Sequence, residues 1–332
     1  MCTLTAHASH VASGTRLHWV ELGAGPPLVL LHGLANSHRT WLRVAGALAT
    51  TRRVLLLDLA GHGLSGRPDA PYTLDWHAAT VGRWLDSLGL EDIDLVGHSF
   101  GGGVAQYLLL THADRVRRLG LVASGGLGRE VTPWLRLLAL PGAEQAIGPF
   151  LGPGTAIALR GLCSEAFSND ERRRQAWMNS APGTARALTR SVRGVIDLSG
   201  QTKTFLDRAR DVRRLPPVAL FWGERDVILP VSQAHRAVAQ IHGARLTTFP
   251  CGHFPHLEQP ERFRDALVGF LDDRAIGRAR IAPTARPPAR RGWIAQSLRA
   301  CVRGLSRWWR RRRRAPTGPL ALLPARTVDR PA

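Results

Sequence analysis

The segment Asp94-Leu95-Val96-Gly97-His98-Ser99-Phe100-Gly101-Gly102-Gly103 decides the fold of this chain. An apolar run ends at a serine that stands between glycines, and the helix-compatible segment Val104 to Leu110 follows at once. This is the pattern Gly-x-Ser-x-Gly in a strand–turn–helix setting. Glycine on both sides lets the backbone turn sharply enough to lift the Ser99 side chain clear of the strand. Ser99 is therefore a candidate nucleophile, and the Phe100 N–H is a candidate oxyanion donor.

The segments before this serine alternate between strands and helices. A first strand is predicted at 16–20. Continuous apolar runs follow at 27–31 and 53–58, and such runs are typical of strands that are buried on both faces. Helical patterns follow at 40–48 and 74–88. Alternation at this spacing predicts an α/β fold with a mostly parallel central sheet flanked by helices.

After a strand predicted at 118–123 the pattern changes. From about Gly128 to Val212 strand signals are absent, and helical stretches are broken by Pro and Gly. Strands and helices alternate again from 217 onward. We therefore predict a core in two parts, 1–127 and 213–273, interrupted by an all-helical cap at 128–212 and followed by a tail at 274–332.

Two acid–base candidates follow the later strands. Asp226 comes after the strand predicted at 217–222, and His253 comes after the strand predicted at 245–249. A serine hydroxyl is a weak nucleophile that needs a hydrogen-bonded base oriented by a third group. We assign His253 as the base and Asp226 as the orienting group. Glu224 and His256 compete for these roles, although Glu224 lies two residues early on its turn.

Four separated signatures resemble the α/β-hydrolase superfamily, in particular capped serine hydrolases of the lipase and esterase type. They are His32-Gly33-Leu34, Asp58-x-x-Gly61-x-Gly63-x-Ser65, Gly97-His98-Ser99-Phe100-Gly101-Gly102, and Gly223-x-x-Asp226-x-x-x-Pro230 followed by Gly252-His253. The resemblance implies a nucleophile elbow at Ser99, with His253 as general base and then acid, and Asp226 as the orienting carboxylate. It also implies an oxyanion hole formed by the backbone N–H groups of Leu34 and Phe100.

The type of nucleophile narrows the reaction that the resemblance implies, because this fold hosts several chemistries. Relatives that open epoxides or displace halide use aspartate at the elbow. With Ser99 in that place, we expect hydrolysis of carboxylic esters through an acyl-enzyme. Hydrolysis of carbon–carbon bonds in ring-fission products is the nearest competing reaction, although such enzymes tend to have tryptophan after the catalytic histidine, where this chain has Phe254. Cofactor-free peroxidation and acyl transfer are also compatible with the motifs, as is a non-catalytic role as a ligand binder or membrane-tethered scaffold.

Apolar residues in and beside the predicted cap are candidates for binding an apolar or lipid-like acyl group, and they are equally compatible with packing inside the cap. The candidates are Leu127, Trp134, Leu138, Phe150 and Trp177, together with Leu137 and Ile147. We assign His32 and Asp58 to bracing loops. The thirteen histidines are scattered and no phosphate-binding or dinucleotide motif stands out, so we expect neither a metal nor a cofactor.

Most of the positive charge lies in the tail. The formal net charge is +20, and residues 275–332 contain fifteen Arg and one acid, which leaves only +6 on the rest of the chain. Near 293–314, apolar residues including two tryptophans fall on one face of a predicted helix and arginines on the other. Such a helix suits an anionic membrane surface. A disordered tail from an arginine-biased proteome is nearly as well supported by the sequence, and nucleic-acid binding ranks below both interpretations.

The remaining features bear on location. No apolar run is long enough to span a membrane, and Met1 to Val20 lack a basic segment followed by an apolar stretch. The four cysteines, at positions 2, 163, 251 and 301, are far apart, which favours reduced thiols. We expect a cytoplasmic protein that lies at the inner membrane face if its tail binds lipid. The sequence does not indicate an oligomeric state.

Overall fold

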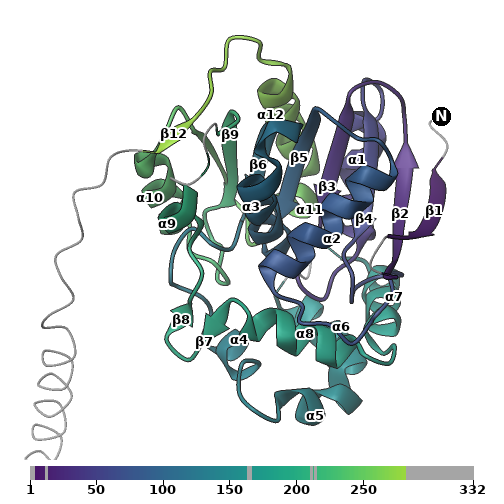
Figure 1. The fold of residues 1–332 in the computed structure, drawn as a ribbon. Helices are drawn as coiled ribbons and strands as arrows, with labels where there is room; N and C mark the ends of the chain where they lie inside the picture. Colours follow the sequence, from purple (N-terminus) through teal and green to yellow (C-terminus); the bar gives the residue numbers. More distant parts are fainter. Residues whose placement is uncertain (1–3, 12–13, 163–166, 210–211, 213–214, 282–332) are drawn as a thin grey trace, which may run out of the picture. The chain divides into compact units, whose positions relative to one another are not determined.

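An eight-stranded sheet forms the centre of the protein in a computed structural model, which describes residues 4–11, 14–162, 167–209, 212 and 215–281. The strand order is β1-β2-β4-β3-β5-β6-β9-β11, and every pairing from β4 to β11 is parallel (Figure 1). The strands are β1 (Thr5–His10), β2 (Arg16–Leu22), β3 (Pro27–Leu31), β4 (Arg53–Asp58), β5 (Ile93–His98), β6 (Val116–Val122), β9 (Val218–Gly223) and β11 (Arg245–Phe249). The predicted α/β fold with a mostly parallel sheet is confirmed.

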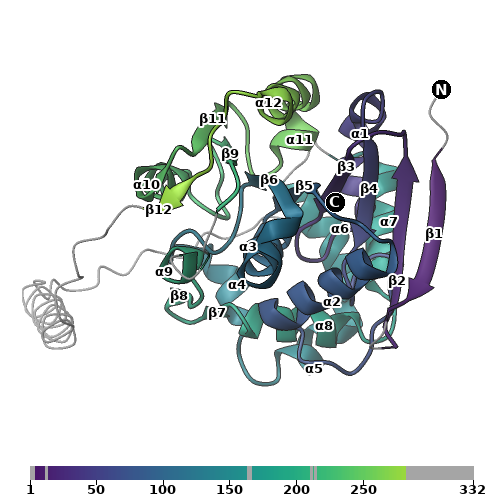
Figure 2. The same ribbon diagram turned by 45° about the horizontal axis from the view of Figure 1, so that its top comes forward.

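The central strands place their side chains alternately in two apolar cores, one on each face of the sheet. In β3, Val29 and Leu31 belong to one core and Leu28 and Leu30 to the other, and all four are fully buried. Helices cover both faces of these strands (Figure 2). They are α2 (Leu74–Ser87) and α3 (Phe100–His112) on one side, and α1 (Leu42–Leu48) and α12 (Pro260–Asp272) on the other. Burial on both faces explains why the strands read as continuous apolar runs.

The edge strand β1 is absent from the prediction made on the sequence. It pairs with β2 in antiparallel fashion, and most of its residues are exposed. Its sequence, Thr-Ala-His-Ala-Ser-His, therefore lacks the apolar run that marks the other strands. The His7 ring stacks on Trp19 of β2, with 5.2 Å between the ring centroids.

A buried carboxylate in β5 connects the sheet to the last helix of the core. Asp94 is fully buried and accepts hydrogen bonds from Arg52 and Arg117, each at 2.9 Å. Arg52 also forms an ion pair with Asp272 at the end of α12. The two guanidinium groups offset the cost of burying the charge on Asp94.

Residues 128–212, hereafter the insertion, consist mainly of helices that lie together beyond one end of the sheet (Figure 1). The longer helices are α6 (Leu151–Leu162), α7 (Asn169–Asn179) and α8 (Thr184–Arg193); the shorter ones are α4 (Pro133–Leu137), α5 (Ala143–Ile147) and α9 (Phe205–Arg208). The expectation of an all-helical segment is wrong in one respect, because β7 (Ile196–Asp197) and β8 (Gly200–Gln201) form an antiparallel pair. Strands of two residues are too short to give a periodic signal.

The chain after the insertion completes the sheet with β9 and β11, accompanied by α10 (Ser232–Gln240) and α11 (Pro255–Glu258). A short strand, β12 (Arg280–Ile281), pairs with β10 (Ile241–His242), so the structure of the core continues past the predicted boundary at 273. The helix predicted near 293–314 lies outside the described residues. No helix within the described part of the chain has both the length and the apolar character needed to cross a bilayer.

Candidate active site

Ser99 occupies a strained turn between the central strand β5 and helix α3. Its backbone has φ 53° and ψ −117°, outside the regions that residues with a Cβ ordinarily adopt. The Ser99 N–H donates a hydrogen bond to the carbonyl oxygen of Val122 at 2.9 Å, which attaches the turn to the neighbouring strand β6. The surrounding structure thus maintains a conformation that presents the serine side chain beyond the edge of the sheet.

Two glycines beside Ser99 are required by close backbone contacts. A Cβ on Gly97 would lie 2.4 Å from the carbonyl oxygen of Gly101, and one on Gly101 would lie 2.4 Å from that of His32. Neither backbone oxygen can move aside without disturbing the turn or the strand β3. The sequence pattern around Ser99 is thus a steric requirement of this turn.

Asp226 and His253 come together at the carboxyl ends of β9 and β11. The His253 Nδ1 atom lies 2.7 Å from Asp226 Oδ2, and both side chains are buried. Asp226 Oδ1 accepts hydrogen bonds from the backbone N–H groups of Ile228, at 2.8 Å, and Leu229, at 2.9 Å. Both carboxylate oxygens therefore have partners, and Oδ2 is held toward the imidazole.

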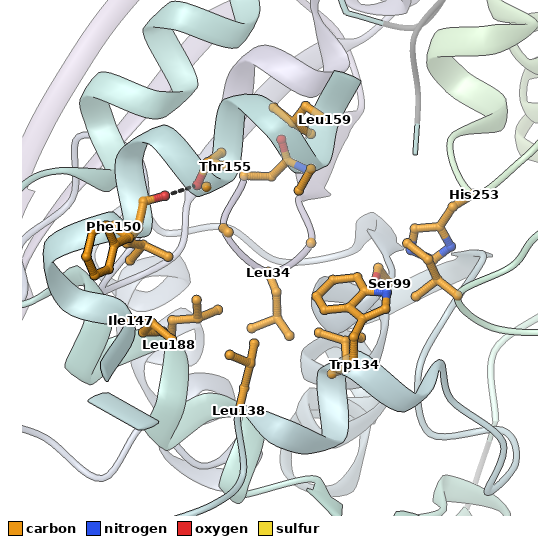
Figure 3. A pocket seen from close by; sticks show the side chains of 18 of the residues that line it. Leu34, Ser99, Trp134, Leu138, Ile147, Phe150, Thr155, Leu159, Leu188 and His253 are labelled. Carbon is orange, nitrogen blue, oxygen red and sulfur yellow. Dashed lines mark hydrogen bonds between the residues drawn. The ribbon is translucent and has the colours of Figure 1, made fainter. Parts of the chain in front are cut away.

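Ser99 and His253 line the same cavity, together with the turn that carries Leu34 (Figure 3). The structure thus brings to one place the three side chains assigned to the triad. The Phe100 N–H lies in the first turn of α3, where backbone N–H groups have no acceptor within the helix. Leu34 lies in the turn after β3, which the Asn36 N–H closes by donating to the Gly33 carbonyl at 3.3 Å.

The rival acid and base lie elsewhere. Glu224 is exposed, and its carboxylate accepts a hydrogen bond from the Thr248 hydroxyl at 2.9 Å. His256 is fully buried, with its Nε2 atom 2.9 Å from the Thr40 hydroxyl oxygen and its ring stacked on Trp41 at 4.3 Å between centroids. Neither residue lines the cavity that contains Ser99.

Cys251 is a buried free thiol close to His253 in sequence. Burial raises the pKa of this thiol to about 12. It therefore stays protonated near neutral pH and is a poor competitor to Ser99 as nucleophile. The cysteines at 2, 163 and 301 lie outside the described residues.

His98, the residue before the serine, supports the loop that carries His253. Its Nε2 atom lies 3.0 Å from the His253 carbonyl oxygen. A carbonyl oxygen can only accept, so His98 is the donor and its proton is on Nε2. Burial lowers the pKa of His98 well below its usual value, which keeps the ring neutral. The sequence indicates a side chain that packs or hydrogen-bonds locally beside the elbow, but not this long-range contact.

Five buried histidines share this neutral state. Burial lowers the pKa of each below 6.5, and for His62 and His256 it falls to about 3. The five are His32, His62, His77, His98 and His256. Below pH 6.5 they favour the unfolded chain, in which they can bind protons.

Asp58 and its neighbours brace the loops below the cavity. Asp58 is fully buried; its burial raises the pKa, but hydrogen bonds from His18 and His38 outweigh that effect and lower it. His18 Nδ1 and His38 Nδ1 lie 2.9 and 3.0 Å from Asp58 Oδ2. These three residues are the one group in the described chain that could supply metal ligands, but each histidine Nδ1 atom lies within hydrogen-bond distance of the carboxylate. His32 likewise braces a loop, since its Nε2 accepts from the Leu59 N–H at 3.0 Å.

The cavity above Ser99 has a volume of about 440 Å³ and lies between the sheet and the insertion. Trp134, Leu138, Phe150 and Ile147, which the sequence suggested, line it. The sequence did not point to several other lining residues, which are Leu135, Thr155, Leu159, Leu188, Ile228 and Phe254. Phe150 is 69% exposed and so lies at the mouth of the cavity.

Three of the suggested residues do not line this cavity. Leu127 is buried in the core that lies under α2 and α3. Trp177 is 70% exposed, because α7 turns Gln175, Met178 and Asn179 inward and leaves Trp177 on its outer face. Leu137 is 59% exposed. The expectation that these three residues contact a substrate in this cavity is therefore wrong.

A second and smaller hollow, of about 50 Å³, also reaches Ser99. Leu34, Phe100 and Ile228 are among the residues that line it, and Lys203 contributes the one positively charged side chain to its described lining. Gln201 also lines it, but its Oε1 accepts from the Gly126 N–H and its amide nitrogen donates to the Glu130 carbonyl. Ser99 therefore stands between a large apolar space and a small one.

Comparison with known proteins agrees with this geometry. A family model described as "Alpha/beta hydrolase family" matches residues 28–266. An uncharacterized protein of Mycobacterium tuberculosis is 35% identical over 261 residues, which cover 75% of this chain and 76% of that protein. The 2-hydroxymuconate semialdehyde hydrolase of a Pseudomonas strain is 33% identical over 278 residues, covering 79% of this chain and 92% of the hydrolase. A hydrolase from Pseudomonas aeruginosa has a similar structure, with a TM-score of 0.68 at 25% identity over 81% of this chain and 99% of the other.

Proposed function

Because the chain belongs to the alpha/beta hydrolase family, we propose that it hydrolyses carboxylic esters with an apolar acyl group through a serine acyl-enzyme. The observation that carries this proposal is the setting of Ser99. It lies in a strained turn, opens onto a cavity of about 440 Å³, and shares that cavity with His253, whose Nδ1 atom is hydrogen-bonded to Asp226. This volume is within the range of pockets that enclose small organic ligands.

The proposed reaction uses each of these groups in turn. His253 takes the proton of the Ser99 hydroxyl as Oγ attacks the ester carbonyl carbon, and Asp226 keeps the remaining imidazole proton on Nδ1. The N–H groups of Leu34 and Phe100 stabilise the oxyanion. His253 then gives its proton to the departing alkoxide. Water, deprotonated by His253, attacks the acyl carbonyl carbon. The bond between that carbon and Ser99 Oγ breaks, His253 returns its proton to Oγ, and the acid is released.

The lining of the cavity supports an uncharged, apolar acyl group. Among the described residues that line it, His98 and His253 have the only ionisable side chains, and burial keeps His98 neutral. A charged substrate placed here would lose hydration without gaining a partner. The apolar face offered by Leu138, Ile147 and Leu188 suits an alkyl or aryl chain.

Hydrolysis of a carbon–carbon bond is the second candidate. It is supported by the similarity to 2-hydroxymuconate semialdehyde hydrolase over most of both chains. Lys203 at the small hollow could pair with a carboxylate of such a substrate. Phe254 stands where we expect tryptophan in these enzymes, which favours the ester reaction instead.

Active-site labelling followed by a substrate panel tests the proposal. A fluorophosphonate should label the wild-type protein and should fail to label Ser99→Ala, which should keep the same fold. Nitrophenyl esters from acetyl to dodecanoyl should be hydrolysed, with kcat/KM increasing as the acyl chain fills the cavity. Labelling without any ester turnover, together with cleavage of 2-hydroxymuconate semialdehyde, would replace the ester proposal with the second candidate. Absence of labelling would indicate a non-catalytic binding protein.

We also propose that the protein associates with anionic membrane surfaces from the cytoplasmic side. The support is the arginine-rich sequence after residue 282, which lies outside the described residues, and the surface of the insertion. Seven of the ten large apolar side chains that are exposed in the described chain belong to the insertion, including Phe150 and Ile157. Truncation after Ala282, which keeps β12, should abolish co-sedimentation with phosphatidylserine vesicles and preserve ester hydrolysis. Unchanged co-sedimentation would rule out the tail as the membrane anchor.

A further inference from the structure

Two buried amide side chains of the insertion hold the turn that contains Leu34. Gln175 and Asn179, one turn apart on α7, both donate hydrogen bonds to the Ala35 carbonyl oxygen, at 2.7 and 2.9 Å. Both side chains are at least 95% buried. Residues four apart lie on the same face of a helix, so α7 presents both donors to one acceptor.

The orientation of these amides is fixed by their partners. A carbonyl oxygen can only accept, so the Gln175 Nε2 must face Ala35. The Gln175 Oε1 then accepts from the Ser37 hydroxyl at 3.1 Å, two residues further along the same loop. Asn179 Nδ2 also donates to the Thr155 hydroxyl oxygen on α6, at 3.0 Å. The contacts therefore connect the loop after β3 to two helices of the insertion.

The turn held in this way is strained. Ala35 has φ 54°, in the left-handed region that glycine adopts more readily than alanine. It is the third residue of the turn from Gly33 to Asn36, a position that takes positive φ in type II turns. A strained turn persists only where the surrounding contacts determine it. The two amide donors on the Ala35 carbonyl are such contacts.

We propose that Gln175 and Asn179 are positioning residues for the oxyanion hole, an inference that rests on the proposed ester hydrolysis. By fixing the Ala35 carbonyl they fix the turn, and with it the direction of the Leu34 N–H. The oxyanion hole is then complete only while α7 is seated on the loop. The insertion thus contributes to the rate of the chemical step as well as to the walls of the cavity.

Removing the amides should lower kcat while substrate binding is retained. Gln175→Met and Asn179→Leu keep roughly the same side-chain volume and remove the donors. For the double variant we expect kcat for a nitrophenyl ester to fall by about 10²-fold with KM within about threefold, because a small displacement of an oxyanion donor has effects of that order. Affinity for a trifluoromethyl ketone, which forms an oxyanion on Ser99, should fall in parallel.

Glu171→Gln provides the matched control on the same helix. Glu171 forms an ion pair with Arg39, with 2.9 Å between Arg39 Nε and Glu171 Oε2, so the substitution loosens α7 without touching Ala35. It should leave kcat within about twofold, as expected for a half-exposed ion pair. An equal fall in kcat in Glu171→Gln would overturn the inference, since general seating of the insertion would then explain the effect. A fall confined to KM in the amide variants would also overturn it.

Loss of activity through misfolding must be distinguished from loss of oxyanion stabilisation. Near-UV circular dichroism and the melting temperature identify variants that keep the native structure. If Gln175→Met does not fold, Asn179→Leu alone gives the test, because Asn179 donates to the same carbonyl. Wild-type turnover of esters establishes the proposed function separately. A folded double variant with wild-type kcat would therefore refute the positioning role and leave the ester reaction intact.

Discussion

Replacing Asp226 with asparagine should inactivate the protein without unfolding it, because the backbone around Asp226 decides how the new amide is oriented. Asp226 Oδ1 accepts from the N–H groups of Ile228 and Leu229. In Asp226→Asn the carbonyl oxygen must take this place, since the amide NH₂ cannot accept from two donors. The NH₂ group then faces His253 Nδ1, at the position where Oδ2 lies 2.7 Å away in the native protein.

The tautomer of His253 determines the size of the effect. With an N–H donor opposite it, Nδ1 must accept, so the ring proton moves to Nε2, the atom that should take the proton of Ser99. The loss of general base catalysis should lower kcat by about 10⁴-fold, or roughly 5 kcal/mol of transition-state stabilisation. Stability should change little, because the variant keeps hydrogen bonds at both positions.

Steady-state hydrolysis of a nitrophenyl ester measures this effect, with melting temperature as the check on folding. Glu224→Gln is the matched control: it changes a carboxylate two residues away that is exposed and contacts Thr248. We expect its kcat to equal that of the wild type. If Asp226→Asn retained more than a tenth of wild-type kcat, or if Glu224→Gln were the inactive variant, the assignment of the acid would be refuted.

Three further predictions concern substrate choice and stability. Gly154→Phe should lower kcat/KM for dodecanoyl relative to acetyl esters by at least about tenfold, because Gly154 lines the cavity and a side chain there would extend into open space. Gly161→Phe, on the same helix but away from the cavity, should leave this ratio unchanged. Equal effects of the two substitutions would contradict the cavity assignment. Asp94→Ala should lower the free energy of unfolding in urea by about 3–5 kcal/mol, because Arg52 would lose its buried partner; a loss below about 1 kcal/mol would contradict this. The buried histidines should leave the free energy of unfolding at its full value above pH 6.5 and lower it as the pH falls below 6.5. The expected slope is about 1.4 kcal/mol per pH unit for each ring that stays neutral in the folded state. His256→Phe should reduce that slope by about one proton, and an unchanged slope would show that His256 does not contribute.

The three candidate catalytic side chains could be predicted from the sequence because each follows a predicted strand and lies within three residues of a glycine. Gly97 and Gly101 are required by the turn at Ser99, and the long apolar runs of β5 and β9 locate the residues that follow them. Such patterns are local in the sequence, so they can be recognised without knowledge of the tertiary structure. The order of the parallel strands then brings their carboxyl ends to one edge.

The contribution of the insertion could not be predicted in the same way. Its helices are short, and α7 is strongly polar, so no apolar stripe shows which face turns inward. Trp177 looked like a cavity residue and is exposed, while the polar Gln175 and Asn179 are buried. Both side chains donate to the Ala35 carbonyl oxygen, which lies 140 residues before Gln175 in the chain. Contacts of this range have no signature in sequence periodicity.

The position of β9 and β11, at one edge of the sheet and after the insertion in the chain, has a consequence for biosynthesis. A ribosome makes β5 and Ser99 long before it makes residue 253, and β9 and β11 can add beside β6 only after the insertion has been made. Domains form on the ribosome from the amino-terminal end. A nascent or prematurely terminated chain therefore carries Ser99 without His253, and it lacks the proposed general base until β11 and the loop after it have been translated.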